Sequence, residues 1–180
     1  MAVVMAVVTA ACSRVPAPFS RAESTSIARA GLGALFVDRE QARSVLLWTG
    51  PLADAPTFGQ KRLRIAATGG LLRAEALTLA HLDTAALHLP VPLIPVDLAL
   101  LDAHFRANPA GWDTWFRRFP GASGIVEVGK PLARRDGAAT MFVGRACGEH
   151  CHSAWRLVLS RTATETWRVD SVIPLRLPRS

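Results

Sequence analysis

The first two thirds of the chain carry apolar residues at the spacing of amphipathic helices. Apolar and charged residues are interspersed in this way over 38–48, and a stretch rich in leucine and alanine over 71–82 also favours a helix. Asp97 is placed to cap a further helix over 98–107, because its carboxylate can accept a hydrogen bond from a backbone N–H of the first turn. Aromatic residues spaced i, i+3, i+4 and i+7 over 112–119 predict another helix.

The last third of the chain is richer in β-branched residues. Two apolar runs, 125–128 and 140–143, lie on either side of an Asp-Gly turn signal at 136–137, which predicts a hairpin. Apolar and polar residues are interleaved over 155–159 and 167–173, as in strands with one face in water. The sequence therefore predicts an α+β fold in which a helical N-terminal half packs on a C-terminal antiparallel β-meander.

Length and composition fit one folded domain. The chain has 180 residues, of which 50% are hydrophobic and 19% charged, enough for one sizeable core. Its uninterrupted apolar runs are shorter than the roughly 18 to 20 residues that span a bilayer as a helix. These features exclude a disordered chain and a polytopic membrane protein.

The chain is basic, with 21 lysines and arginines against 14 acidic residues and a net charge of +7. Such a surface attracts anions, including lipid head groups and acidic polymers. The arginines are scattered, however, with adjacent pairs only at 117–118 and 134–135, and no zinc-finger or other nucleic-acid-binding motif accompanies them. We therefore expect no nucleic-acid partner, and we regard an anionic component of a cell envelope as the partner to consider.

The N-terminal segment 1–12 has the features of a signal peptide. Residues 1–11 are apolar and uncharged, the length of a signal-peptide core, and the sequence Thr-Ala-Ala-Cys that ends at Cys12 resembles a bacterial lipobox. This predicts export and a lipid attached to Cys12, so that the protein is periplasmic or anchored to a membrane. Simple cleavage of the signal and a short buried apolar segment are the alternatives. Proline, serine and alanine over 13–25 predict a flexible tether, which leaves 26–180 as a single α+β domain.

One cluster of reactive side chains stands out, Cys-Gly-Glu-His-Cys-His at 147–152, between two predicted strands. Without Cys12, the remaining cysteines are the pair Cys147 and Cys151, and in an oxidising compartment a disulfide is the expected state of such a pair. Gly148 would permit the turn that brings the two Cα atoms close enough.

Two alternatives remain open for this cluster. Cys147, His150, Cys151 and His152 are ligand types that suit Zn or Cu, although their spacing matches no common zinc motif. A thiol-dependent enzyme is the other alternative, with a histidine that activates a cysteine and Glu149 that orients the histidine. No active-site motif is present, so the catalytic residues of such an enzyme would be unknown. The spacing of the other histidines suggests no site; these are His81, His88 and His104.

The region 109–174 carries a longer pattern, in which an aromatic helix ends in Pro-Gly-x-x-Gly and is followed by two strands, a Cys-Gly-x-x-Cys turn and a hairpin that contains tryptophan. The matching residues are Trp112, Phe116, Phe119, Pro120, Gly121, Gly124, Cys147, Gly148, Cys151 and Trp167. With these residues the chain resembles a group of exported bacterial proteins of uncharacterised function. The resemblance implies export and a paired role for the two cysteines, and it implies no activity, substrate or cofactor.

This chain departs from that pattern at two places. Gly129-Lys130 stands where the group has Ser-Arg, and His152 and Ala154 stand where it has glycines. The sequence as a whole predicts an exported, lipid-anchored envelope protein that acts as a binding or structural module and needs no cofactor. A periplasmic Zn- or Cu-binding protein is the second hypothesis, and a thiol-dependent enzyme is the third.

Overall fold

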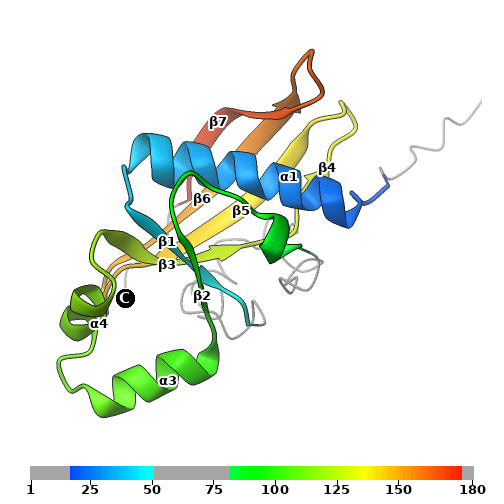
Figure 1. Cartoon of the computed structure of the whole chain (residues 1–180). Helices are drawn as coiled ribbons and strands as arrows, with labels where there is room; N and C mark the ends of the chain where they lie inside the picture. Colours follow the sequence, from blue (N-terminus) through cyan, green and yellow to red (C-terminus); the bar gives the residue numbers. More distant parts are fainter. Residues whose placement is uncertain (1–16, 51–81, 176–180) are drawn as a thin grey trace, which may run out of the picture.

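The structure is a computed structural model, and it describes residues 17–50 and 82–175. Helix α1 lies across one face of a single mixed β-sheet, and α3 and α4 lie beyond one end of the sheet (Figure 1). The helical elements are α1 (Arg21–Leu32), the π-helix η1 (Gly33–Arg39), the 3-10 turn η4 (Thr84–Ala86), α3 (Leu98–Ala107) and α4 (Trp112–Arg118). The strands are β1 (Ser44–Trp48), β2 (Leu93–Val96), β3 (Ala122–Val128), β4 (Leu132–Ala133), β5 (Ala139–Ala146), β6 (His152–Arg161) and β7 (Trp167–Pro174).

The sheet has a parallel part and an antiparallel part. Its strand order is β2-β1-β3-β5-β6-β7, and β4 pairs with β5 beside this path. Strand β1 is parallel to both of its neighbours, whereas β3, β5, β6 and β7 pair antiparallel in succession. Strands β2 and β3 lie on opposite sides of β1 and run in the same direction, so the chain between them must cross over the sheet. Helices α3 and α4 belong to this connection.

The fold is α+β, but the expected helical N-terminal half is wrong. The segment 38–48, expected as a helix, is the end of η1 followed by β1, and β1 and β2 extend the sheet in parallel. All five residues of β1 are buried. A strand buried on both faces is apolar throughout rather than alternating, so its pattern resembles that of a buried helix segment. The helix expected over 71–82 lies outside the described residues apart from Leu82, which is not helical.

Helix α1 begins with a capping box. The Ser20 hydroxyl accepts a hydrogen bond from the Glu23 backbone N–H, and the Glu23 carboxylate accepts one from the Ser20 N–H in return. The Ser20 hydroxyl also donates to the Glu23 carboxylate at 3.0 Å, and the pKa of Glu23 is lowered first by the Ser20 N–H, then by this hydroxyl, and then by the guanidinium of Arg161. Arg161 also donates to the Glu23 carboxylate, which ties the start of α1 to the end of β6. Residues 21–25, expected as the end of a flexible tether over 13–25, are therefore the first turns of α1.

The apolar face of α1 packs on the antiparallel strands. Ile27 and Leu32 are completely buried, and Gly31 approaches Met141 of β5 and Leu157 of β6 so closely that a Cβ would overlap both side chains. Glycine at position 31 therefore lets the helix lie close to the sheet.

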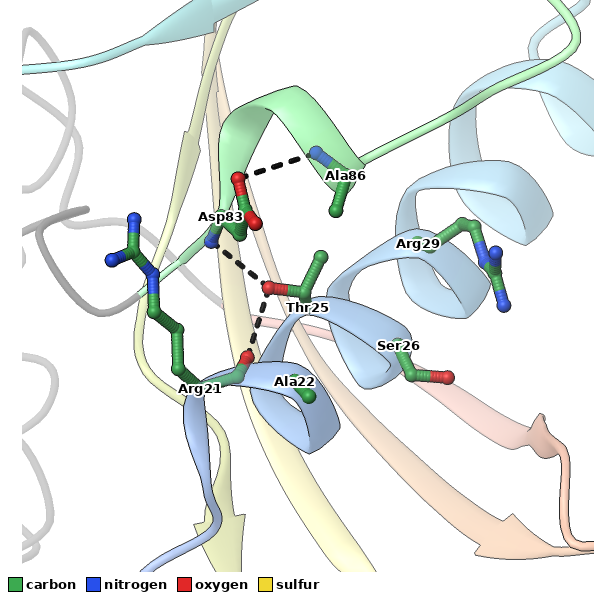
Figure 2. A pocket seen from close by; sticks show the side chains of 7 residues that line it. All are labelled: Arg21, Ala22, Thr25, Ser26, Arg29, Asp83 and Ala86. Carbon is green, nitrogen blue, oxygen red and sulfur yellow. Dashed lines mark hydrogen bonds between the residues drawn. The ribbon is translucent and has the colours of Figure 1, made fainter.

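One hydroxyl on α1 joins the helix to the 3-10 turn η4. Thr25 Oγ1 accepts a hydrogen bond from the Asp83 backbone N–H at 2.9 Å and donates one to the Arg21 carbonyl at 2.9 Å (Figure 2). Thr25 is buried, so this contact fixes the start of η4 against the first turns of α1.

The expected helix over 98–107 is confirmed as α3. Asp97 Oδ1 accepts a hydrogen bond from the Leu100 N–H at 2.7 Å, as the capping argument predicted. Helix α4 follows, and its Trp115 is completely buried. The Trp115 ring lies 5.0 Å from the ring of His104 and 4.8 Å from that of Phe119 between centroids. The aromatic residues of the two helices therefore form one cluster.

The four strands expected in the last third are confirmed as β3, β5, β6 and β7, and they pair antiparallel. The turn at 136–137 joins β5 to the short β4 rather than directly to β3. In this turn the Arg134 N–H donates to the Ala138 carbonyl at 2.9 Å, and Gly137 has a φ of 80°, which favours glycine.

Candidate functional site

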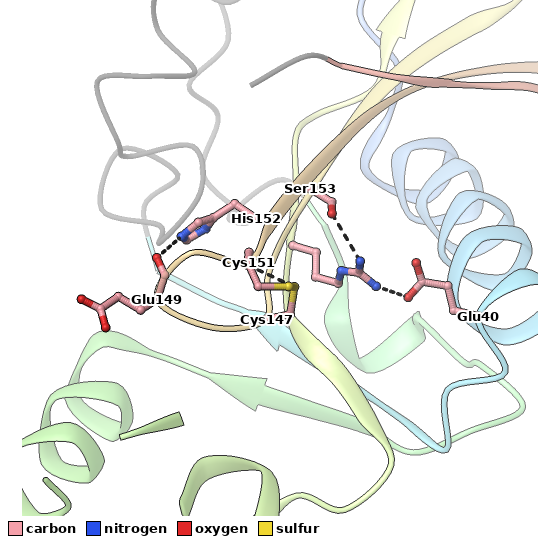
Figure 3. Close-up of a disulfide and its surroundings, with 7 residues drawn as sticks. Glu40, Cys147, Glu149, Cys151, His152 and Ser153 are labelled. Atoms are coloured by element: carbon pink, nitrogen blue, oxygen red, sulfur yellow. Dashed lines mark hydrogen bonds and ion pairs between the residues drawn. A yellow bond between two sulfur atoms is a disulfide. The ribbon is translucent and has the colours of Figure 1, made fainter. Parts of the chain in front are cut away.

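The candidate site is the connection between β5 and β6, the region where sequence analysis placed the reactive cluster. The two strands are paired from Ala139–Leu159 to Ala146–His152, so residues 147–151 form a short loop at the end of this ladder. The sulfur atoms of Cys147 and Cys151 lie at bonding distance, with Cα atoms 4.9 Å apart (Figure 3). The structure thus agrees with a disulfide between them.

Backbone contacts also close this loop. The Cys147 N–H donates to the Cys151 carbonyl at 2.7 Å. A Cβ at Gly148 would lie 3.2 Å from the Cys151 Cβ, so glycine leaves the room that the turn needs. A cross-link over so few residues stabilises the folded state by about 2 kcal/mol in the chain-entropy model. The disulfide therefore fixes the end of the β5–β6 hairpin.

The ligands of the metal hypothesis do not converge on one point. Neither sulfur of a disulfide is a thiolate, and metal ions bind the thiolate. His152 Nε2 lies 3.1 Å from the Glu149 carbonyl oxygen, and His150 is exposed. Among the described residues, no group of three or more His, Cys, Asp or Glu is placed to hold a metal ion. The described geometry thus supplies no argument for Zn or Cu here.

The catalytic arrangement of the thiol-enzyme hypothesis is likewise not formed. A nucleophilic cysteine needs a free thiol, and the sulfur atoms of Cys147 and Cys151 are joined to each other. Glu149 meets His152 through its backbone carbonyl, not through the carboxylate that was expected to orient a histidine. In this disulfide state, the loop holds no activated nucleophile.

Polar contacts that no sequence pattern indicated hold this hairpin to the N-terminal region. Arg145 of β5 donates to the Glu40 carboxylate just after η1 and to Ser153 Oγ of β6 at 3.3 Å (Figure 3). Its guanidinium carbon also lies 5.3 Å from the centroid of the Trp155 ring. The Arg145 and Glu40 side chains are 18% and 20% exposed, so water weakens this pair only partly.

The other expected site residues lie away from this loop or outside the described residues. Cys12, the expected lipid-attachment residue, and His81 belong to the segments that the structure does not describe. His88 is exposed. His104 is buried in the aromatic cluster, where its Nε2 lies 3.0 Å from Thr114 Oγ1. His104 therefore serves packing and hydrogen bonding, not a ligand set.

A second feature, a cavity of about 420 Å³, lies between α1 and η4. Figure 2 shows Arg21 and Arg29 on opposite sides of the lining, with Thr25, Ser26 and Asp83 between them. Its remaining lining residues are two alanines, whose small side chains leave the space open. Nothing in the sequence pattern pointed to this cavity, because its residues come from the expected tether and from either side of the undescribed segment 51–81.

Comparison of the chain with protein-family models, with curated proteins and with solved structures finds no match. In the part of the chain that the structure describes, no helix is long and apolar enough to cross a membrane. The interpretation of function therefore rests on the residues themselves.

Proposed function

We propose that this chain is an exported, lipid-anchored protein of a bacterial envelope, whose folded domain acts as a binding or structural module. The observation that carries the proposal is the disulfide between Cys147 and Cys151. Disulfides form and persist in oxidising compartments such as the periplasm and are rare in the cytosol, where thiols are kept reduced. A protein that relies on such a cross-link is best suited to a place outside the cytoplasm.

The N-terminal sequence supports the same location. The apolar segment 1–11 and the lipobox-like residues that end at Cys12 have the composition of a cleavable lipoprotein signal. The described fold begins its first helix at Arg21, so few residues would separate a lipid on Cys12 from the domain. A lipid at this position would hold the domain close to the membrane surface.

A binding or structural role is proposed because the polar clusters of the described residues are used within the fold. Arg145 is bound to Glu40 and Ser153, and His104 lies against Thr114. General acid–base or nucleophilic catalysis needs a nucleophile and a base within hydrogen-bond reach of each other and of a substrate. The contact of His104 with Thr114 does bring an imidazole and a hydroxyl together, but His104 is buried among aromatic rings, where a substrate does not reach it.

The test of the anchor is the substitution Cys12→Ser. We expect it to move the protein from the membrane fraction to the soluble fraction of a bacterial host, because it removes the atom to which the lipid is attached. The measurement is immunoblotting of fractions separated by ultracentrifugation.

The matched control for the anchor is the double variant Cys147→Ser/Cys151→Ser, which should stay in the membrane fraction because it keeps Cys12. Unchanged partitioning of Cys12→Ser would refute lipidation at this residue. If both variants left the membrane fraction, the change in partitioning would result from damaged folding and not from the missing anchor.

A further inference from the structure

We propose that the cavity between α1 and η4 binds a ligand with two anionic groups, one held by Arg21 and one by Arg29. The cavity is partly open to solvent and has a volume of about 420 Å³, within the range of small-molecule sites. Both arginines are exposed and line it. This inference gives a ligand class to the binding role proposed above and does not depend on export.

The helix sets the spacing of the two cations. Arg21 and Arg29 are eight positions apart on α1, so their Cα atoms are separated by about 12 Å along the axis. Figure 2 shows their side chains extending in opposite directions, on either side of Thr25 and Asp83, rather than converging on one point. Two anionic groups at the ends of a small molecule would fit this arrangement better than a single phosphate.

These two guanidinium groups form no ion pair with Asp83, the carboxylate that lines the same cavity. Five arginines of the described residues do pair with carboxylates, whereas others, including Arg117, do not. Within the same residues, neither Arg21 nor Arg29 has an ion-pair partner. A free guanidinium offers a fork of N–H donors that matches phosphate and carboxylate oxygens in pairs.

The lining residues between the two arginines determine which groups a ligand can carry between its two anionic ends. Asp83 lines the cavity on the η4 side, and its Oδ1 accepts a hydrogen bond from the Ala86 N–H at 3.3 Å (Figure 2). Its negative charge would repel an anion at this position, whereas its second oxygen can accept a hydrogen bond from a hydroxyl group. Ser26 adds a hydroxyl to the lining on the side of Arg29 (Figure 2). The ligand class is therefore two phosphates or carboxylates joined by a hydroxylated, uncharged spacer.

The wall that carries Asp83 is fixed in place. Thr25 Oγ1 binds the Asp83 N–H and is itself buried, so the position of η4 relative to α1 is set before any ligand arrives. A preformed site loses less entropy when it binds.

The probe for the test is fructose 1,6-bisphosphate, which carries phosphates at the two ends of a hydroxylated sugar. Isothermal titration calorimetry on purified protein should detect binding, with glucose 6-phosphate bound about tenfold more weakly because it reaches only one arginine. Short polyphosphate, which lacks the uncharged spacer, should also bind more weakly than the bisphosphate. Added salt should weaken all binding, since both contacts are ionic.

Variants separate this site from a general attraction to a basic protein. Arg21→Gln and Arg29→Gln should each weaken binding of the bisphosphate about tenfold. Arg117→Gln, at an exposed arginine on α4, should leave it unchanged. An equal loss in Arg117→Gln, no binding of the bisphosphate, or equal affinity for glucose 6-phosphate would each overturn the proposal. All are measured on soluble purified protein, so failure here leaves the test of export untouched.

Discussion

Replacing Gly124 by alanine is expected to destabilise the domain by about 3 kcal/mol, because two costs add at this position. Gly124 has a φ of 131°, a backbone conformation that other residues adopt only with strain. A Cβ there would also lie 2.4 Å from the Ala146 carbonyl oxygen, a backbone atom that cannot rotate away. The clash falls where β3 pairs with β5, next to the disulfide loop. Urea denaturation followed by circular dichroism measures the loss.

Gly137→Ala is the matched control for this clash. Gly137 also has a positive φ, 80°, but its Cβ would meet open space. The expected cost there is about 1 kcal/mol, from backbone strain alone. Equal costs for the two substitutions would mean that the close approach of β3 to β5 at Gly124 is not as described.

Trp115→Ala is expected to lower the free energy of unfolding by about 4 kcal/mol, a large part of what holds a domain of this size together. Trp115 is completely buried, and its ring contacts those of His104, Phe105 and Phe119. The substitution leaves a cavity under the α3–α4 pair that the neighbouring rings can fill only in part. The measurement is again urea denaturation, together with near-ultraviolet circular dichroism.

Trp112→Ala is the control for Trp115→Ala, since Trp112 begins the same helix but is only partly buried. It should cost clearly less, because part of its surface is already in water. A loss as large as that of Trp115→Ala would contradict the assignment of Trp115 as the residue that anchors α4.

The elements predicted correctly are those whose signals lie within their own residues. Asp97 and the residues after it contain both the cap and the apolar face of α3, and alternation gave β6 and β7. Strand β1 was missed because its burial depends on partners distant in sequence, β2 and β3. Pro95 lies within β2, where its missing N–H is tolerated because β2 is an edge strand of the described sheet.

The start of α1 was predictable in principle. Ser20 and Glu23 have the spacing of a capping box, a recognised signal for a helix N-terminus. The prolines and small residues before it led to the prediction of a tether over 13–25. Without α1 as a helix, nothing indicated that Arg21 and Arg29 lie on the same cavity.

The candidate site was predictable where its residues are close in sequence. Cys147 and Cys151 are four positions apart, so the spacing alone made a disulfide-closed turn feasible. The pair of Arg145 with Glu40 joins residues 105 positions apart, and no local pattern specifies such a contact. The sequence thus predicted the pair of cysteines that the structure places at bonding distance, but not the ion pair that attaches the hairpin to the rest of the domain.

The central claim is that Cys147 and Cys151 are joined in the protein as cells make it, outside the cytoplasm. The most direct measurement traps free thiols with iodoacetamide at lysis of the native host and analyses the peptides of the purified protein by mass spectrometry without reduction. We expect a cross-linked peptide that contains both cysteines, with neither alkylated. Recovery of the two cysteines as separate alkylated residues would contradict the disulfide and remove the main support for export.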